Sequence, residues 1–281
     1  MKTSNQLKAL VRNLSKEKNV EAEVILRNFM MERFLERISI SDYKHNFILK
    51  GGMLISAIVG IDTRTTMDMD ATIKGQTLTA SEITTIIEDI LCIPIDDNVE
   101  FALRGIEEIH EDADYPGYRV SIGAILDKTR QTIKVDITTG DFVTPKEIKY
   151  SYHLMFEDRA ISIMAYNLET VLAEKFETII TRGATTSRMR DFYDIYILTT
   201  VCTYDSGVYE AALEKTVEKR GTIGQMEDIV GVIRMIADNS IMIELWQRYQ
   251  KKYPYAAEVS WNMTIGALER LAQNNPFQQN K

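Results

Sequence analysis

The feature that most constrains the fold is a change in the spacing of apolar residues along the chain. Between residues 98 and 140, apolar and polar residues alternate through three segments, VEFALRGIEEIH, YRVSIGAILD and QTIKVDITTGD. This period of two is typical of β-strands that bury one face. After a loop that contains Pro145, apolar residues recur at helical spacing, as in NLETVLAEKFETIITRG. The pattern therefore predicts a mixed β-sheet in the first half and helices in the second.

Helical patterns also precede the predicted sheet. Residues 20–38 place apolar side chains near helical spacing with charged residues between them, so we expect helices in the first forty residues. The fold class that follows is α+β. We expect a mixed-sheet domain with flanking helices over residues 1–155, followed by a mainly α-helical domain over residues 156–281.

Composition and charge exclude several classes of protein. With 281 residues, of which 45% are hydrophobic, the chain can bury a large core and is too apolar for a disordered protein. No apolar run approaches the roughly 18 residues that span a bilayer, and none near the start has signal-peptide length, so we expect a cytoplasmic protein. The net charge of -8 argues against sequence-independent DNA binding, although a local basic patch remains compatible with it.

Two aspartates suggest a metal site. From Met67 the alternation puts Asp68 and Asp70 on one side of a predicted strand, with Cα atoms roughly 6.5 to 7 Å apart. Carboxylates this close repel each other unless a cation lies between them, and Mg²⁺ prefers such oxygen ligands. Asp136 lies on a later strand, opposite the apolar face formed by its neighbours. As a third carboxylate it would let two metal ions clamp the attacking and leaving oxygens of a phosphoryl or nucleotidyl transfer.

A glycine pair precedes these aspartates. Gly51 and Gly52 stand before MLISAIVG, which is expected to start a helix. Glycine backbones let N–H groups approach an anion closely, and a helix N-terminus favours phosphate. Glycines for phosphate and aspartates for metal would form the two halves of a nucleotide site. The alternative is that alternating aspartates on an exposed strand and Gly-Gly in a turn have no chemical role.

The segment KGGMLISAIVGIDTRTTMDMD resembles the first motif of the AbiEii/AbiGii family of nucleotidyltransferases, which are toxins of type IV toxin–antitoxin and abortive-infection systems. In that motif Gly-Gly or Gly-Ser is followed by Arg, a hydroxyl residue and Asp-x-Asp. The matching residues here are Gly51, Gly52, Arg64, Thr66, Asp68 and Asp70. The wider polymerase-β-like nucleotidyltransferase superfamily has a third carboxylate that Asp136 in KVDIT resembles. The resemblance implies that the three aspartates are catalytic and hold Mg²⁺ or Mn²⁺, and that Lys50, the glycines, Arg64 and Thr66 bind the NTP.

A second segment, AEKFETIITRGATTSRMRDFYDIYIL, resembles the later helical motifs of the family. Its matching residues are Lys175, Arg190, Asp191 and Asp194. The resemblance implies catalytic roles for Lys175 and Asp191, NTP binding by Arg190, mainly structural support by Asp194, and a helical domain that completes the active-site cleft. Lys175 lies at the edge of an apolar stripe, where its ammonium needs an anion such as a triphosphate. The alternatives are that Lys175 reaches solvent or a neighbouring glutamate, and that the aspartates form a structural ion pair.

The function implied by the resemblance is toxicity through metal-dependent transfer of a nucleoside monophosphate from an NTP to an acceptor, which is tRNA in some members. A cognate antitoxin, expected to be a winged-helix protein, would be encoded by the adjacent gene. A tRNA acceptor requires a basic surface, for which Lys175, Arg182, Arg188 and Arg190 are candidates. Two alternatives stay open: an antibiotic-modifying nucleotidyltransferase, whose cationic substrates the acidic net charge favours, and a non-catalytic nucleotide-binding module.

Overall fold

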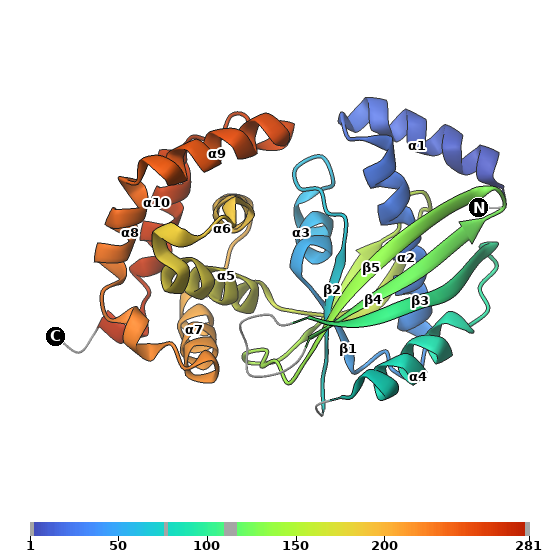
Figure 1. Cartoon of the computed structure of the whole chain (residues 1–281), viewed down its shortest axis with the longest axis horizontal. Helices are drawn as coiled ribbons and strands as arrows, with labels where there is room; N and C mark the ends of the chain where they lie inside the picture. Colours follow the sequence, from blue (N-terminus) through green and yellow to red (C-terminus); the bar gives the residue numbers. More distant parts are fainter. Residues whose placement is uncertain (1–2, 76–77, 110–116, 279–281) are drawn as a thin grey trace. The chain divides into compact units, whose positions relative to one another are not determined.

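The computed structural model describes residues 3–75, 78–109 and 117–278 and contains a mixed, seven-stranded β-sheet (Figure 1). The described chain divides into two compact units, Met1–Asp141 with Glu147–Ala165, and Phe142–Lys146 with Tyr166–Lys281. The helices of the first unit are α1 (Ser4–Lys18), α2 (Ala22–Ile40), α3 (Gly51–Val59) and α4 (Ala80–Leu91). Its strands are β1 (Phe47–Lys50), β2 (Met69–Ile73), β3 (Val99–Ile109), β4 (Gly117–Leu126), β5 (Thr129–Thr139), β6 (Ile148–His153) and β7 (Ala160–Ala165).

The sheet has the strand order β3-β4-β5-β2-β1-β7-β6. Strands β3, β4 and β5 form an antiparallel meander, β5 pairs with β2 in parallel, β2 pairs with β1 antiparallel, and β1 pairs with β7 in parallel. Both parallel and antiparallel pairs are present, so the predicted mixed sheet and the α+β fold class are confirmed. The segment DADYPG at residues 112–117, whose composition is typical of a turn between the first two predicted strands, lies mostly outside the described residues.

One face of the sheet is packed against helices. The ring of Phe34 on α2 contacts Phe47 of β1 and Phe101 of β3, and α4 buries its isoleucines at positions 83, 87 and 90. On this same face, four side chains of the central strands β4 and β5 are fully buried: Val120, Ile122, Ile133 and Val135. Their neighbours in sequence point to the opposite face, because side chains alternate along a strand.

Two details of the first unit differ from the sequence analysis. Strand β2 begins at Met69, so Asp68 lies in a bend just before the strand instead of within it. Residues 148–165, expected to be loop and helix, form the β6–β7 hairpin, in which Tyr152, Ile161 and Ile163 are buried. The segment IKYSYH alternates apolar and polar residues and AISIMA does so in part, so the sequence analysis missed a periodic signal that was present. The domain boundary predicted after residue 155 lies between β6 and β7, whereas both strands belong to the first unit.

The second unit is mainly helical, as predicted. Its helices are α5 (Leu168–Arg182), α6 (Met189–Val201), α7 (Ser206–Arg220), α8 (Ile229–Ala237), α9 (Ser240–Lys252) and α10 (Trp261–Ala272). Asn167 caps α5 by accepting a hydrogen bond from the Thr170 backbone N–H, and aromatic contacts of Trp261 with Phe192 and Trp246 join α6, α9 and α10. Among the described helices, none combines the length and the hydropathy needed to cross a membrane.

Candidate functional site

Four charged residues occupy one row across the sheet of the first unit. Lys50 on β1 is the register partner of Asp70 on β2, which is the partner of Asp136 on β5, which is the partner of Arg119 on β4. Register partners on neighbouring strands, about 4.8 Å apart, project to the same face. The structure thus brings Asp70 and Asp136 side by side although they are far apart in the sequence, and flanks them with two cations.

Arg119 forms a bidentate ion pair with Asp136. Its Nε and Nη2 donate to the two carboxylate oxygens at 2.8 and 2.7 Å, and Asp136 is only 9% exposed. The hydrogen bond and the charge of Asp136 raise the pKa of Arg119 against an opposing effect of burial, and Asp68 contributes to the increase. Asp68 is therefore close enough for its charge to act on the same guanidinium. The sequence analysis missed Arg119, because only the strand register reveals that it faces Asp136.

The glycine pair begins α3 and contacts Asp70. The backbone N–H of Gly52 donates to Oδ2 of Asp70 at 3.1 Å, so the first turn of the helix holds a carboxylate of this same chain. Gly51 has φ of +63°, and a Cβ at this position would lie 2.0 Å from the same oxygen. Only glycine fits at Gly51, for both its backbone conformation and its contact with Asp70.

The bend that carries Asp68 is fixed by buried polar contacts. Thr66 donates its hydroxyl to the backbone carbonyl of Asp68 at 3.0 Å, and Asn28 of α2 donates its side-chain amide to the carbonyl of Thr66 at 2.9 Å. Arg64 is 1% exposed and its guanidinium donates to the carbonyl of the following residue. A Cβ at Gly52 would lie 2.6 Å from Oγ1 of Thr66, so the bend packs directly against the helix start. Asn28, which no motif pointed to, belongs to this arrangement.

Lys50 also has a carboxylate partner. Its ammonium donates to Oδ2 of Asp141 at 2.7 Å, and the hydroxyl of Thr138 donates to the same oxygen. Lys50 is part-buried, with a side chain 14% exposed. The sequence analysis did not anticipate Asp141, which follows the end of β5. The expected contact of Lys50 with a nucleotide stays a prediction.

The carboxylates can be tested for their fit to a metal ion. Among residues 3–75, 78–109 and 117–278, no three histidine, cysteine or acidic side chains gather closely enough to hold one. A physical reason is that Arg119 engages both oxygens of Asp136. The donor chemistry nevertheless fits Mg²⁺, which commonly binds through one or two carboxylates together with substrate phosphates. Asp68 and Asp70 would supply this minimum, and Asp136 would add a third oxygen donor if Arg119 released it.

In the second unit, Lys175 of α5 forms a buried ion cluster with α6. Its ammonium lies 2.7 Å from Asp191 and 2.8 Å from Asp194, and Arg188 lies 2.6 Å from the second oxygen of Asp191. Burial raises the pKa of Asp191, but Lys175 and Arg188 outweigh it and the net pKa is lowered. Burial lowers the pKa of Lys175, but the two aspartates outweigh it and the net pKa is raised. Lys175 thus pairs with these aspartates rather than with a neighbouring glutamate, and the pair with Asp191 is ionised at neutral pH.

Arg190 turns toward the tyrosines at the end of α9. Its Nη2 donates to the hydroxyl of Tyr253 at 3.0 Å, and its guanidinium carbon lies 5.5 Å from the centre of the same ring. Tyr253 in turn stacks on Tyr255. The role in nucleotide binding that the sequence suggests for Arg190 stays a prediction.

Comparison with known proteins adds independent findings. A family model described as the nucleotidyl transferase AbiEii toxin of the type IV toxin–antitoxin system matches residues 33–267. Among solved structures, MenT4, a nucleotidyltransferase toxin from Mycobacterium tuberculosis H37Rv, has a TM-score of 0.59 at 13% identity, covering 96% of this chain and 94% of its own. JHP933 from Helicobacter pylori has a TM-score of 0.51 at 14% identity, covering 90% and 91%. At these identities the structural likeness is one of fold. No curated protein sequence matches the chain.

Proposed function

The chain belongs to the AbiEii family of nucleotidyltransferase toxins of type IV toxin–antitoxin systems, and from this membership we propose that it transfers a nucleoside monophosphate from an NTP to tRNA. The observation that carries the proposal is the pair Asp70 and Asp136, side by side on one face of the sheet, with Asp68 directly before the strand. Nucleotidyl transfer needs such a group of carboxylates, whereas a site that only bound a nucleotide would not.

A divalent metal, Mg²⁺ or Mn²⁺, would bind to Asp68 and Asp70 with Asp136 as the third ligand, and would stabilise charge on the attacking and leaving oxygens. The chain itself positions these ligands. The Gly52 amide orients Asp70, and the contacts of Thr66 with Asn28 set the bend that carries Asp68. These contacts reduce the reorganisation needed when substrate binds.

The remaining groups of the first unit suit the triphosphate and the acceptor. Lys50 has a part-buried ammonium in the same row as Asp70, and the start of α3 favours an anion. To bind phosphate, Lys50 would have to give up its contact with Asp141, and the Gly52 amide its contact with Asp70. Arg64 and Thr66 would act mainly by holding the bend. Asp136 would also accept the proton of the attacking hydroxyl, which requires that Arg119 give up part of its ion pair.

Asp68→Ala tests this proposal, with Asp62→Ala as a matched control. Asp62 lies on the same loop but pairs at the surface with Lys18 at 3.6 Å. Purified protein would be incubated with each labelled NTP and with total RNA or an aminoglycoside, and growth would be followed after expression. We expect the wild type and Asp62→Ala to label tRNA and stop growth, and Asp68→Ala to do neither. An active and toxic Asp68→Ala would refute the assignment, and label on the aminoglycoside alone would identify a small-molecule acceptor.

The cognate antitoxin is the proposed protein partner, because the family is defined by toxin–antitoxin systems. We expect its gene to lie beside the toxin gene and to encode a winged-helix protein. Co-expression of that gene should restore growth in cells that produce the wild-type toxin. Failure of every adjacent gene to do so would remove this part of the proposal.

A further inference from the structure

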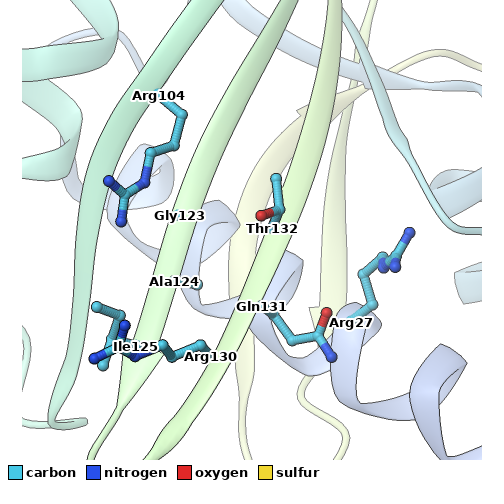
Figure 2. A pocket seen from close by; sticks show the side chains of 8 residues that line it. All are labelled: Arg27, Arg104, Gly123, Ala124, Ile125, Arg130, Gln131 and Thr132. Carbon is cyan, nitrogen blue, oxygen red and sulfur yellow. The ribbon is translucent and has the colours of Figure 1, made fainter.

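Three arginines line a hollow of about 370 Å³ in the first unit (Figure 2). Arg27 comes from α2, Arg104 from β3 and Arg130 from β5, with Gln131 and Thr132 between them. Figure 2 shows Arg104 and Arg130 at one side of the hollow, and Gln131 with Arg27 at the other. Neither the motifs nor the proposed catalytic chemistry accounts for this cluster.

Most strand residues of the hollow lie on the same sheet face as Asp70 and Asp136, whereas Ala124 and Gln131 alternate to the opposite face, which α2 with Arg27 covers. Alternate register pairs of β4 and β5 share this face, namely Arg119 with Asp136, Ser121 with Lys134, Gly123 with Thr132, and Ile125 with Arg130. The intervening pairs Val120 with Val135 and Ile122 with Ile133 are fully buried on the opposite face. Since Arg130 and Asp136 are six residues apart, the hollow lies about 20 Å along the strand from Asp136. Exposed Lys134 lies between them.

A β-bulge brings Arg104 into the hollow. The register of β3 and β4 shifts between Leu103 and Gly105, and such bulges commonly redirect a side chain. The guanidinium of Arg104 lies over Gly123, where an added Cβ would be 2.6 Å from its Nε. The absence of a side chain at Gly123 leaves the space that Arg104 occupies.

Two of the three arginines have no ion-pair partner in the described part of the chain. Arg27 pairs with Glu23 at 2.8 Å, but the side chains of Arg104 and Arg130 make no ion pair or hydrogen bond within the part of the chain that the structure describes. Guanidinium groups bind phosphate oxygens in a planar, bidentate geometry. On a chain with a net charge of -8, the guanidinium groups of Arg104 and Arg130, close together on the carboxylate face, therefore indicate a site for an anionic ligand.

We infer that this hollow binds backbone phosphates of the RNA acceptor, and that the exposed face of β4 and β5 carries the strand toward Asp136. The inference rests on the proposed function. Charge complementarity alone would also suit an acidic protein segment. The continuity of the hollow with the carboxylate row favours RNA, because an acceptor must reach both places whereas a protein partner need not. The contacts would be to phosphate and independent of sequence.

The test compares Arg104→Ala/Arg130→Ala with a control that removes two exposed charges elsewhere, Arg248→Ala/Lys251→Ala on α9. Binding of labelled, unfractionated tRNA would be measured by fluorescence anisotropy at several salt concentrations. We expect the hollow variant to bind at least about tenfold more weakly, and its log–log salt slope to shrink by about 1.4, at about 0.7 per lost contact to a single strand. The control should change the affinity by less than about twofold.

Transfer assays on the same proteins separate this inference from the proposed function. We expect the KM for tRNA to rise about tenfold in the hollow variant while the KM for NTP stays unchanged. Wild-type tRNA affinity in the hollow variant, or an equal loss in the control, would overturn the inference. Transfer to tRNA with an unchanged KM would overturn it and leave the proposed function intact. Hollow-dependent tRNA binding without any transfer would instead refute the proposed function alone.

Two further measurements separate loss of RNA contacts from loss of stability and from recognition of an acidic protein. Both arginines are exposed, so the melting temperature of the hollow variant should equal that of the wild type. If it falls, Arg104→Gln/Arg130→Gln, which keeps part of each side chain and its hydrogen-bonding capacity but removes the charge, would be measured in its place. Polyglutamate serves as the acidic-protein probe. If it binds through the hollow while tRNA binding does not depend on the arginines, the surface recognises protein and the inference for RNA is wrong.

Discussion

Gly51→Ala tests directly whether the glycine pair at the start of α3 holds the carboxylate of Asp70 in place. The added Cβ would lie 2.0 Å from Oδ2 of Asp70, and no real contact of this kind is shorter than about 3 Å, so the carboxylate must move by about 1 Å or more. The move weakens the 3.1 Å hydrogen bond from the Gly52 amide. The residue would also hold φ near +63°, a region unfavourable to alanine.

The magnitude follows from these two effects. A left-handed backbone costs a non-glycine residue about 1–2 kcal/mol, and loss of a hydrogen bond to a charged, part-buried carboxylate costs about 1–2 kcal/mol more. We therefore expect the free energy of unfolding to fall by about 2–4 kcal/mol. Misplacement of a reacting group by about 1 Å can reduce turnover about 100-fold. Asp70 should thus lose most of its catalytic contribution even at temperatures where the variant is fully folded.

Two other glycines calibrate this prediction. A Cβ at Gly52 would meet Oγ1 of Thr66 at 2.6 Å without a positive φ, whereas a Cβ at Gly224 would meet nothing within 4 Å. Urea unfolding and NTP-dependent labelling should therefore rank Gly51→Ala as most damaged, Gly52→Ala as intermediate and Gly224→Ala as near wild type. Activity of Gly51→Ala within about threefold of Gly224→Ala would refute the argument that Asp70 is held against the helix start.

The other predictions concern ion pairs. Lys175→Met should lower the free energy of unfolding by about 3–5 kcal/mol at pH 8, because it leaves buried carboxylates uncompensated, while exposed Lys215→Met should cost under about 1 kcal/mol. The lowered pKa of Asp191 means that, in the wild type, its ionised carboxylate adds to the free energy of unfolding above about pH 4 and that this contribution is lost below it. In Lys175→Met, protonation instead relieves the uncompensated carboxylate, so the difference in free energy of unfolding between the two proteins should narrow from pH 8 to pH 5 in urea unfolding. A constant difference would contradict the ion cluster. Arg119→Gln should lower the free energy of unfolding by about 1 kcal/mol without metal. Because Asp136 becomes available, Mg²⁺ should raise the melting temperature of this variant more than that of the wild type. Equal increases would exclude competition between Arg119 and the metal.

The fold class could be predicted because its signals are local. Alternation in residues 98–140 and helical spacing after residue 166 depend only on neighbours in the sequence, and both are confirmed. The β6–β7 hairpin was not predicted although IKYSYH alternates apolar and polar residues, because the whole segment after Pro145 was assigned to loop and helix. β7 is stabilised by its parallel pairing with β1, more than 100 residues earlier. Such non-local pairing leaves little trace in the short segment itself.

In the candidate site, too, local features could be predicted from the sequence and non-local contacts could not. Asp70 and Asp136 could be chosen as candidates from the sequence because each alternates with apolar residues on a strand, and Asp68 was chosen with them although it lies in the bend before β2. The cationic partner of Asp136 could not be predicted, because Arg119 faces it only through the register of β4 with β5. The ion cluster at Lys175 could not be predicted either, because it depends on the packing of α5 against α6. Spacing along α6 also left the partner of its aspartates undecided. Charge compensation within this fold is therefore a property of tertiary contacts.

Compensation of the aspartate charges affects the state of the site before substrate binds. Three carboxylates close together would repel one another and favour partial protonation or local opening of the site. Here Arg119 neutralises Asp136 and a backbone amide at the start of α3 holds Asp70, so the protein offsets part of the repulsion with its own groups. Folding then need not await a metal. A metal that bound to Asp136 would have to compete with Arg119, and this competition would favour full assembly of the site when NTP phosphates supply additional metal ligands.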